Sequence, residues 1–326
     1  MRNPTINQHF ISRAEQYLNA SNPSAKARNR NIYSYGVTKV DSENFDISEA
    51  KKVGVSNNLS DLDLYSFEVL DKKVRLNFEN EFGNYESNIE KWSVSLINKV
   101  NCGASDVSEE LQMIFKLKFL NAIRSPYSFK ETLSFFKMLI NLYPTDKDLK
   151  EIYDRIDTSN KPHMSSVCKR YGFTEKEYIL WLKLLYMVLY VKDTDGVNVL
   201  EAIVKSFYEK PENYIQVVLC TYTKGQAVLL SDKSFNQFDD TSVNINYEFN
   251  LNSVAHLSYS FIDITKALPN HPLHGNKRVL DAFRAQKKEI NLTLCNDNNE
   301  LLLAYNTRTI FQCHDRVFCK VDDFAL

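Results

Sequence analysis

The hydrophobic period changes twice along this chain, and this change restricts the fold more than any other feature of the sequence. Before about residue 84, apolar residues occur in short strand-like runs, at 28–37 and 74–78. From there they recur every three or four residues for about 130 residues, as in helices that pack on one face. From residue 214 onward, short strand-like runs return.

This order predicts an α+β fold with a β-containing N-terminal segment, a central helical bundle and a β-rich C-terminal third. We expect the three parts to span 1–83, 84–213 and 214–326, with the first and last sharing one sheet system as a composite domain. The polar stretch 41–61 reads as a surface loop. The strands expected in the last third are 214–222, 226–230, 245–251, 256–262, 289–294, 301–305 and 316–320.

The composition is that of an ordinary soluble globular protein. Hydrophobic residues make up 44% and charged residues 25%, and there are only eight glycines and eight prolines. The longest apolar run, 178–191, contains Lys183 and is shorter than the roughly 20 residues that cross a bilayer. The six cysteines form no CxxC pair and no secretory leader is recognisable. We therefore expect no membrane association and a cytoplasmic protein with reduced thiols.

A capping box near the N-terminus marks the first candidate site. Ser12 and Glu15 have the spacing at which each side chain caps the other's backbone, which predicts a helix beginning at Arg13. His9 then precedes the positive end of that helix, where an anionic group is favoured. An imidazole that titrates near neutrality and an arginine fork suit a phosphate or carboxylate. The alternative is structural: His9 bonds a neighbouring loop while the apolar residues after it fill the core.

The net charge of −1 gives no overall attraction to nucleic acid, but the charges are unevenly distributed. Residues 1–40 hold six basic side chains and only one acidic one, a balance of +5. A second basic cluster lies in a predicted short helix at 276–288, and its cations are Lys277, Arg278, Arg284, Lys287 and Lys288. If the two clusters meet, they form a face for phosphates. The alternative is that these charges are scattered and solvated.

Five blocks, taken in order, resemble the mostly bacterial family called domain of unknown function 4238. They are the opening Gln8-His9-Phe10-Ile11-Ser12-Arg13, the aromatic strand 32–35, the helix end 119–126 that contains Arg124, the strand end Ser231-Asp232, and the late segments 247–252, 305–306 and 316–318. Ser12 stands where the family usually has proline, and Lys233-Ser234 replaces an Asn-Pro. The resemblance covers most of the chain. It implies a related fold and a common site, and some relatives lie among bacterial genes against phage.

Together, the residues and the resemblance lead to two hypotheses about function. In the first, an anti-phage defence protein acts on nucleic acid as a nuclease or phosphodiesterase. His9 is then general base or phosphate ligand, and Asp232 is acid, base or metal ligand. The side chains expected to bind substrate are Gln8, Arg13, Arg124, Asn306, Lys277 and Arg278. In the second, the protein is a non-catalytic sensor or binds a protein partner encoded nearby.

Each candidate also has a structural interpretation. Asp232 can cap a turn, Arg124 can bond the carbonyls of a helix end, and Asn306 can close a hairpin. Among possible metal ligands, Cys295, Cys313, His314 and Cys319 have a spacing that matches no zinc pattern, so we assign no metal site. The sequence contains no phosphate loop, dinucleotide fingerprint or HExxH motif. It leaves open whether a divalent metal ion assists.

Overall fold

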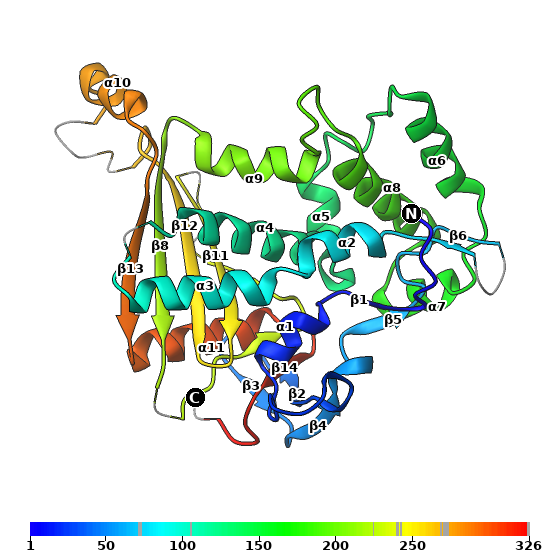
Figure 1. Cartoon of the computed structure of the whole chain (residues 1–326), viewed down its shortest axis with the longest axis horizontal. Helices are drawn as coiled ribbons and strands as arrows, with labels where there is room; N and C mark the ends of the chain where they lie inside the picture. Colours follow the sequence, from blue (N-terminus) through cyan, green and yellow to red (C-terminus); the bar gives the residue numbers. More distant parts are fainter. Residues whose placement is uncertain are drawn as a thin grey trace.

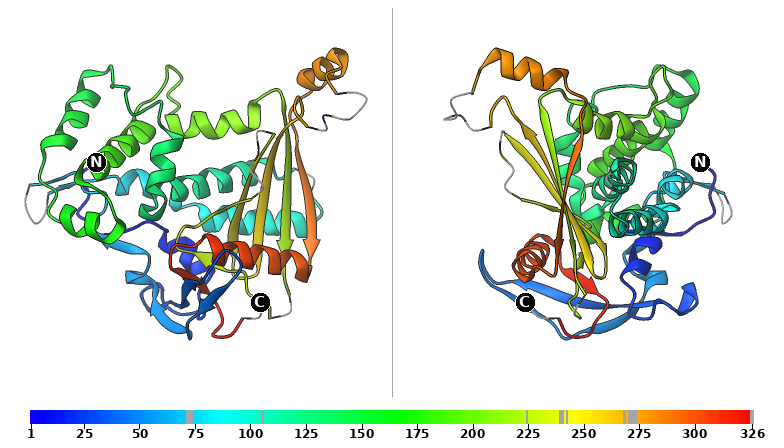
Figure 2. Two further views of the ribbon diagram at one scale, coloured as in Figure 1. Left: turned by 180° about the vertical axis from the view of Figure 1, so that it is seen from behind. Right: turned by 60° about the vertical axis from the view of Figure 1, so that its left-hand side comes forward.

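A five-stranded sheet has the helical bundle on one face and the helix α11 (Asn299–Gln312) on the other (Figure 1; Figure 2, right). The computed structural model describes residues 1–70, 74–104, 106–223, 225–238, 241, 243–267, 269 and 274–324. The N-terminal strands and the last strand form a smaller sheet beside the main one. This arrangement confirms the predicted α+β class.

The main sheet has the order β10-β11-β12-β8-β13. Its strands are β8 (Asn213–Thr221), β10 (Asn236–Gln237), β11 (Asn244–Asn252), β12 (Ala255–Asp263) and β13 (Ile290–Asn296). Neighbours are antiparallel except β13, which runs parallel to β8 at the sheet edge. The parallel partners β8 and β13 are far apart in the sequence, and the chain between them contains β11, β12 and the helix α10 (Lys277–Ala285).

The second sheet joins the two ends of the chain, as the sequence predicts. The last strand, β14 (Arg316–Cys319), pairs antiparallel with β2 (Asn31–Lys39) and also with β9 (Leu230–Ser231). Two further short strands, β3 (Phe45–Ile47) and β4 (Lys51–Gly54), extend β2. The remaining N-terminal elements are β1 (Asn7–His9), α1 (Arg13–Leu18), β5 (Ser60–Leu62), β6 (Glu68–Val69), β7 (Arg75–Leu76) and the short 3-10 turns Ala27–Asn29 and Val55–Asn57.

The helical middle packs on the main sheet through α4 (Ser108–Arg124). Every residue of its second half, 117–124, is buried, as in a helix enclosed by a core. The ring of Phe115 lies at its centre, 5.1 Å from the ring of Tyr259 and 5.3 Å from that of Phe261 on β12. The other helices are α2 (Glu79–Glu86), α3 (Ile89–Asn101), α5 (Phe129–Phe135), α6 (Lys147–Thr158), α7 (Met164–Tyr171), α8 (Glu175–Tyr190) and α9 (Val199–Glu209), with the 3-10 turn Pro126–Ser128 before α5.

Three local predictions from the sequence are wrong. The stretch 301–305, expected as a strand, lies in helix α11 (Asn299–Gln312), because Asn298 caps the helix and the buried residues recur at helical spacing. The expected loop 41–61 contains β3 and β4 and the beginning of β5. The backbone groups of β3 and β4 form hydrogen bonds with β2, and those of β5 form them with β1. The helical middle begins at Glu79, five residues before the expected boundary at residue 84. Of the helices in the described residues, none is both long and apolar enough to cross a membrane.

Candidate functional site

Strand β1 orients the first candidate residues in opposite directions. It pairs with β5, and alternate side chains of a strand face opposite ways. Gln8 is fully buried: its amide nitrogen donates to the Ser66 hydroxyl at 3.0 Å, and its carbonyl oxygen accepts from the backbone N–H of Tyr65 at 2.5 Å. His9 points the other way and borders a cavity. Gln8 therefore holds the neighbouring loop, and His9 is the residue of the pair that faces the cavity.

Helix α1 begins at the predicted residue. The Ser12 hydroxyl accepts from the backbone N–H of Glu15 at 3.1 Å, which confirms the cap. The reciprocal half of the capping box is replaced, because the Glu15 carboxylate bonds Lys118 and Asn121 in the core. The helix has only six residues, so its dipole offers little to an anion. Any anion bound here would depend on side chains.

The cavity beside α1 has a volume of about 490 Å³, within the size range of small-ligand sites. Helix α2 forms its other wall. The titratable side chains that line it are His9, Arg13, Glu79 and Glu86, and Tyr17 adds an aromatic wall. The cavity thus collects an imidazole, a guanidinium and two carboxylates from segments about 70 residues apart in the sequence.

Burial keeps His9 neutral at physiological pH. Together with the positive charges of Arg13 and Arg124, it lowers the pKa of the imidazole to about 4. Nε2 lies 3.4 Å from the backbone carbonyl oxygen of Val55. A carbonyl oxygen only accepts, so Nε2 carries the hydrogen in the neutral ring and Nδ1 is the basic atom.

Two glutamates on α2 line the opposite wall. Glu79 and Glu86 are seven residues apart, two helical turns, so both face the cavity. Burial, reinforced by the negative charge of Glu86, raises the pKa of Glu79 to about 7. The Glu79 Oε1 atom is buried and has no hydrogen-bond partner among the described residues. Burial also raises the pKa of Glu86, although Arg124 opposes this effect.

Arg124 does not line the cavity but lies behind its wall, next to Glu86. It ends α4, is fully buried and forms an ion pair with Glu86. Its guanidinium lies 4.7 Å above the ring of Phe82 and donates to the Asn121 side-chain oxygen at 2.8 Å. Arg13 is exposed at the cavity mouth, and no ion-pair partner for it occurs in the described part of the chain. The site therefore has one fixed cation behind its wall and one accessible cation at its entrance.

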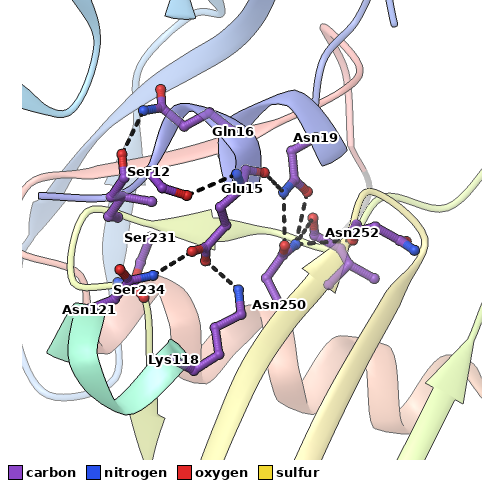
Figure 3. Close-up of polar contacts among 12 residues, drawn as sticks. Ser12, Glu15, Gln16, Asn19, Lys118, Asn121, Ser231, Ser234, Asn250 and Asn252 are labelled. Atoms are coloured by element: carbon purple, nitrogen blue, oxygen red, sulfur yellow. Dashed lines mark hydrogen bonds and ion pairs between the residues drawn. The ribbon is translucent and has the colours of Figure 1, made fainter. Parts of the chain in front are cut away.

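A buried polar network joins α1 to α4 behind this cavity wall (Figure 3). Glu15 on α1 lies between Lys118 and Asn121 of α4 and accepts hydrogen bonds from both. The Glu15 and Lys118 side chains are 0% and 1% exposed. One turn further along α1, Asn19 exchanges hydrogen bonds with Asn250 of β11 at 2.8 and 3.0 Å. The network ties α1 to the core and so fixes the cavity wall that carries Arg13.

Asp232 has a structural environment away from this cavity. Its buried carboxylate accepts from the backbone N–H groups of His314, Asp315 and Arg316 at 2.7, 2.9 and 3.0 Å. Burial raises its pKa to about 7. The predicted convergence of His9 with Asp232 is not seen: their hydrogen-bond partners lie on different segments, and Asp232 does not line the cavity.

The other candidates also lie outside the cavity. Asn306 is buried in α11, where its side chain accepts from the backbone N–H of Leu229 at 3.1 Å and donates to the Ala227 carbonyl at 3.0 Å. Lys277 and Arg278 are exposed in α10, which extends from the far end of the main sheet (Figure 2, left). The two basic clusters therefore do not form one face with the cavity.

The glutamates are the part of the site that sequence reasoning missed. The run 74–78 was expected as a strand, and the helix was expected from about residue 84, so Glu79 was placed in a connecting segment. A signal was present: Asn77 precedes the helix and forms a turn in which its side chain accepts from the backbone N–H of Glu79, and Glu79 and Glu86 follow at helical spacing. No arrangement of three or more His, Cys, Asp or Glu side chains suited to a metal ion occurs in the described residues.

A second cavity of about 480 Å³ lies between α4 and α9. Its lysines face glutamates: Lys116 is 3.1 Å from Glu201, and Lys205 is 3.7 Å from Glu209. Burial also displaces pKa values in the second cavity, those of Tyr208 and Lys288. The first cavity differs because it holds an imidazole and a carboxyl group whose displaced pKa values, about 4 and about 7, suit a base and an acid. We therefore take the cavity between α1 and α2 as the candidate site.

Searches with the chain against protein-family models, curated proteins and solved structures found no match.

Proposed function

We propose that the cavity between α1 and α2 is an acid–base site that cleaves a phosphodiester bond of RNA. One observation carries the proposal: the usual order of acid strengths is reversed. His9 has a pKa of about 4 and Glu79 a pKa of about 7, so between these values the imidazole is neutral and the carboxylic acid protonated. Two titratable groups whose environments separate their pKa values have the properties of a catalytic base and acid.

RNA suits this pair because it supplies its own nucleophile, the ribose 2′-hydroxyl. Nδ1 of His9 takes the hydroxyl proton while the oxygen attacks phosphorus. The bond from phosphorus to the 5′-oxygen breaks, and the Glu79 carboxylic acid gives its proton to that oxygen. The products are a 2′,3′-cyclic phosphate and a 5′-hydroxyl, and solvent returns both groups to their starting states.

The remaining lining residues would bind the substrate. Arg13 at the cavity mouth is positioned to hold a phosphate oxygen, and the added negative charge of the reacting phosphate favours such a contact. Tyr17 offers a ring for a base to stack on, and Arg30 lies 4.8 Å above that ring. Arg124 would act on the phosphate only through its field, because its guanidinium is buried against Glu86.

The test is incubation of the protein with end-labelled RNA and DNA, with and without Mg²⁺ or Mn²⁺. We expect cleavage of RNA in the presence of a chelator, with cyclic-phosphate ends, and a loss of roughly 10²-fold or more for His9→Ala and for Glu79→Gln. Glu81→Gln is the matched control, because Glu81 lies on the same helix but does not line the cavity. Unchanged cleavage in both cavity variants would refute the proposal.

A different observation favours the alternative of a partner-binding module. Large apolar side chains are exposed at the end of α5 and in the segment that follows it: Phe135 is 51%, Met138 87% and Leu142 51% exposed. Such a group is typical of protein interaction sites. If RNA is neither cleaved nor bound, this surface becomes the principal candidate. Both functions fit the anti-phage role implied by the family resemblance, and loss of phage protection in the Glu79→Gln strain would link that role to the cavity.

Binding of nucleic acid by α10 remains a proposal of its own. Lys277 and Arg278 are exposed on a helix with no buried residue, so they would contact phosphates by charge rather than by shape. Changing both to glutamine should weaken RNA binding most at low salt. It should leave the single-turnover cleavage rate at saturating protein unchanged.

A further inference from the structure

Two of the six cysteines face each other on neighbouring strands. Cys220 of β8 and Cys295 of β13 are direct register partners, and their side chains are hydrogen-bonded. Neighbouring strands are about 4.8 Å apart, within the range of roughly 4.4–6.8 Å over which a disulfide joins two Cα atoms. Both are free thiols here. Because β13 is the edge strand, it has room to make the small shift that a bond requires.

The surroundings give the two thiols different reactivities. Cys220 is 1% exposed, and burial raises its pKa to about 12. Cys295 is only half-buried, so dissolved oxidants can reach it first. The Tyr222 hydroxyl bonds the Cys220 thiol and lies 3.1 Å from Nε2 of the buried His256, which fixes the inner sulfur in place. One thiol is therefore accessible and the other is held in contact with it.

We propose that Cys220 and Cys295 form a reversible dithiol–disulfide site that a hydroperoxide oxidises. The Cys295 thiolate attacks the peroxide, the O–O bond breaks, and a proton converts the leaving oxygen to an alcohol or water. The resulting sulfenic acid is attacked by the Cys220 sulfur. The S–O bond breaks, and the departing hydroxide leaves as water with the thiol proton. The peroxide gains the two electrons that the thiols lose, and a low-molecular-weight thiol reverses the oxidation.

The disulfide would join the edge strand β13 covalently to its neighbour β8. It would close a long loop that contains β11, β12 and α10, and closing a loop constrains the unfolded chain. The end of β13 already contacts the segment after β8, since the Thr223 hydroxyl donates to the Asp297 carboxylate at 2.7 Å. Oxidation should therefore raise the melting temperature without requiring a new fold. This inference does not depend on the chemistry of the α1–α2 cavity.

The experiment treats the reduced full-length protein with equimolar hydrogen peroxide and measures the intact mass, followed by mapping of linked peptides. We expect a loss of about 2 Da, a linked peptide joining residues 220 and 295, a higher melting temperature and full reversal by dithiothreitol. Cys102→Ser, which removes an exposed thiol elsewhere, should form the same link.

Two further variants make the test decisive. Cys295→Ser and Cys295→Ala should both fail to form the link, and either suffices if the other folds poorly. A wild-type mass that only increases by oxygen additions, with no linked peptide, would overturn the proposal. So would an equal loss of 2 Da in the Cys295 variants, because another pair of thiols would then form the disulfide.

Discussion

Replacing Lys118 by methionine should strongly destabilise the protein, because it leaves the Glu15 carboxylate buried without its cation. The two side chains are 1% and 0% exposed, so solvent cannot take over the role of the ammonium group. Removing one partner of such a buried pair costs roughly 3–5 kcal/mol. Asn121 alone would remain to bond the carboxylate. For a chain of this size, the loss corresponds to a fall in melting temperature on the order of 10 °C.

Urea and thermal unfolding measure this loss, and a double-mutant cycle with Glu15→Gln isolates the pair. The double variant should be less destabilised than the sum of the two single variants, since the uncompensated charge is gone. The matched control is Lys205→Met: Lys205 is 59% exposed in its pair with Glu209, so this change should cost no more than roughly 0.5 kcal/mol. A Lys118→Met variant as stable as this control would refute the assigned network.

Three further predictions concern single positions. Gly83→Ala should stabilise α2 by roughly 0.5–1 kcal/mol, because a Cβ there meets no atom within 4 Å. Gly172→Ala should instead destabilise the protein, because the backbone φ of +72° at this position is strained for alanine. Urea unfolding of both variants measures the two changes. Asp232→Ala should lower the free energy of unfolding by roughly 1–3 kcal/mol, since three backbone N–H groups lose their acceptor, and equal stability would contradict the turn-capping role. Burial raises the pKa of Glu79 from 4.5 to about 7, so the unfolded chain loses this proton first and stability falls as the pH rises through that window. Glu79→Gln should flatten that fall between pH 5 and pH 7, and an unchanged slope would contradict the raised pKa.

The sequence predicts the order of strand-rich and helical segments better than the secondary structure of single short stretches. The cap at Ser12 and the strands that became β8, β11 and β12 follow from local patterns, and the structure confirms them. The change to a helical period is also visible in the sequence, but the first helix begins five residues earlier than residue 84. The stretch 301–305 failed because Leu301, Leu302 and Leu303 have no alternation that separates strand from helix. The helix cap at Asn298 was the better signal.

The candidate site was only partly predictable, because the whole fold, and not the local sequence, decides which distant residues lie together. Local chemistry identifies His9 and Arg13, and both line the cavity. The resemblance identifies Arg124, which does not line the cavity but lies near enough for its charge to lower the pKa of His9. Glu79 was missed because its role depends on burial against α1, which no local pattern encodes. Asp232 and Asn306 are polar residues that suit a site by their chemistry alone. In the structure, both side chains instead bind backbone groups.

The pH dependence of RNA cleavage is the most direct test of the central claim that His9 and Glu79 act as a reversed acid–base pair. The rate for the wild type should follow a bell between the two pKa values, about 4 and about 7, with its maximum near pH 5.5. In Glu79→Gln the fall above pH 7 should disappear along with most of the rate. A wild-type rate that rises steadily through pH 8, or a bell that persists unchanged in the Glu79→Gln variant, would contradict the account.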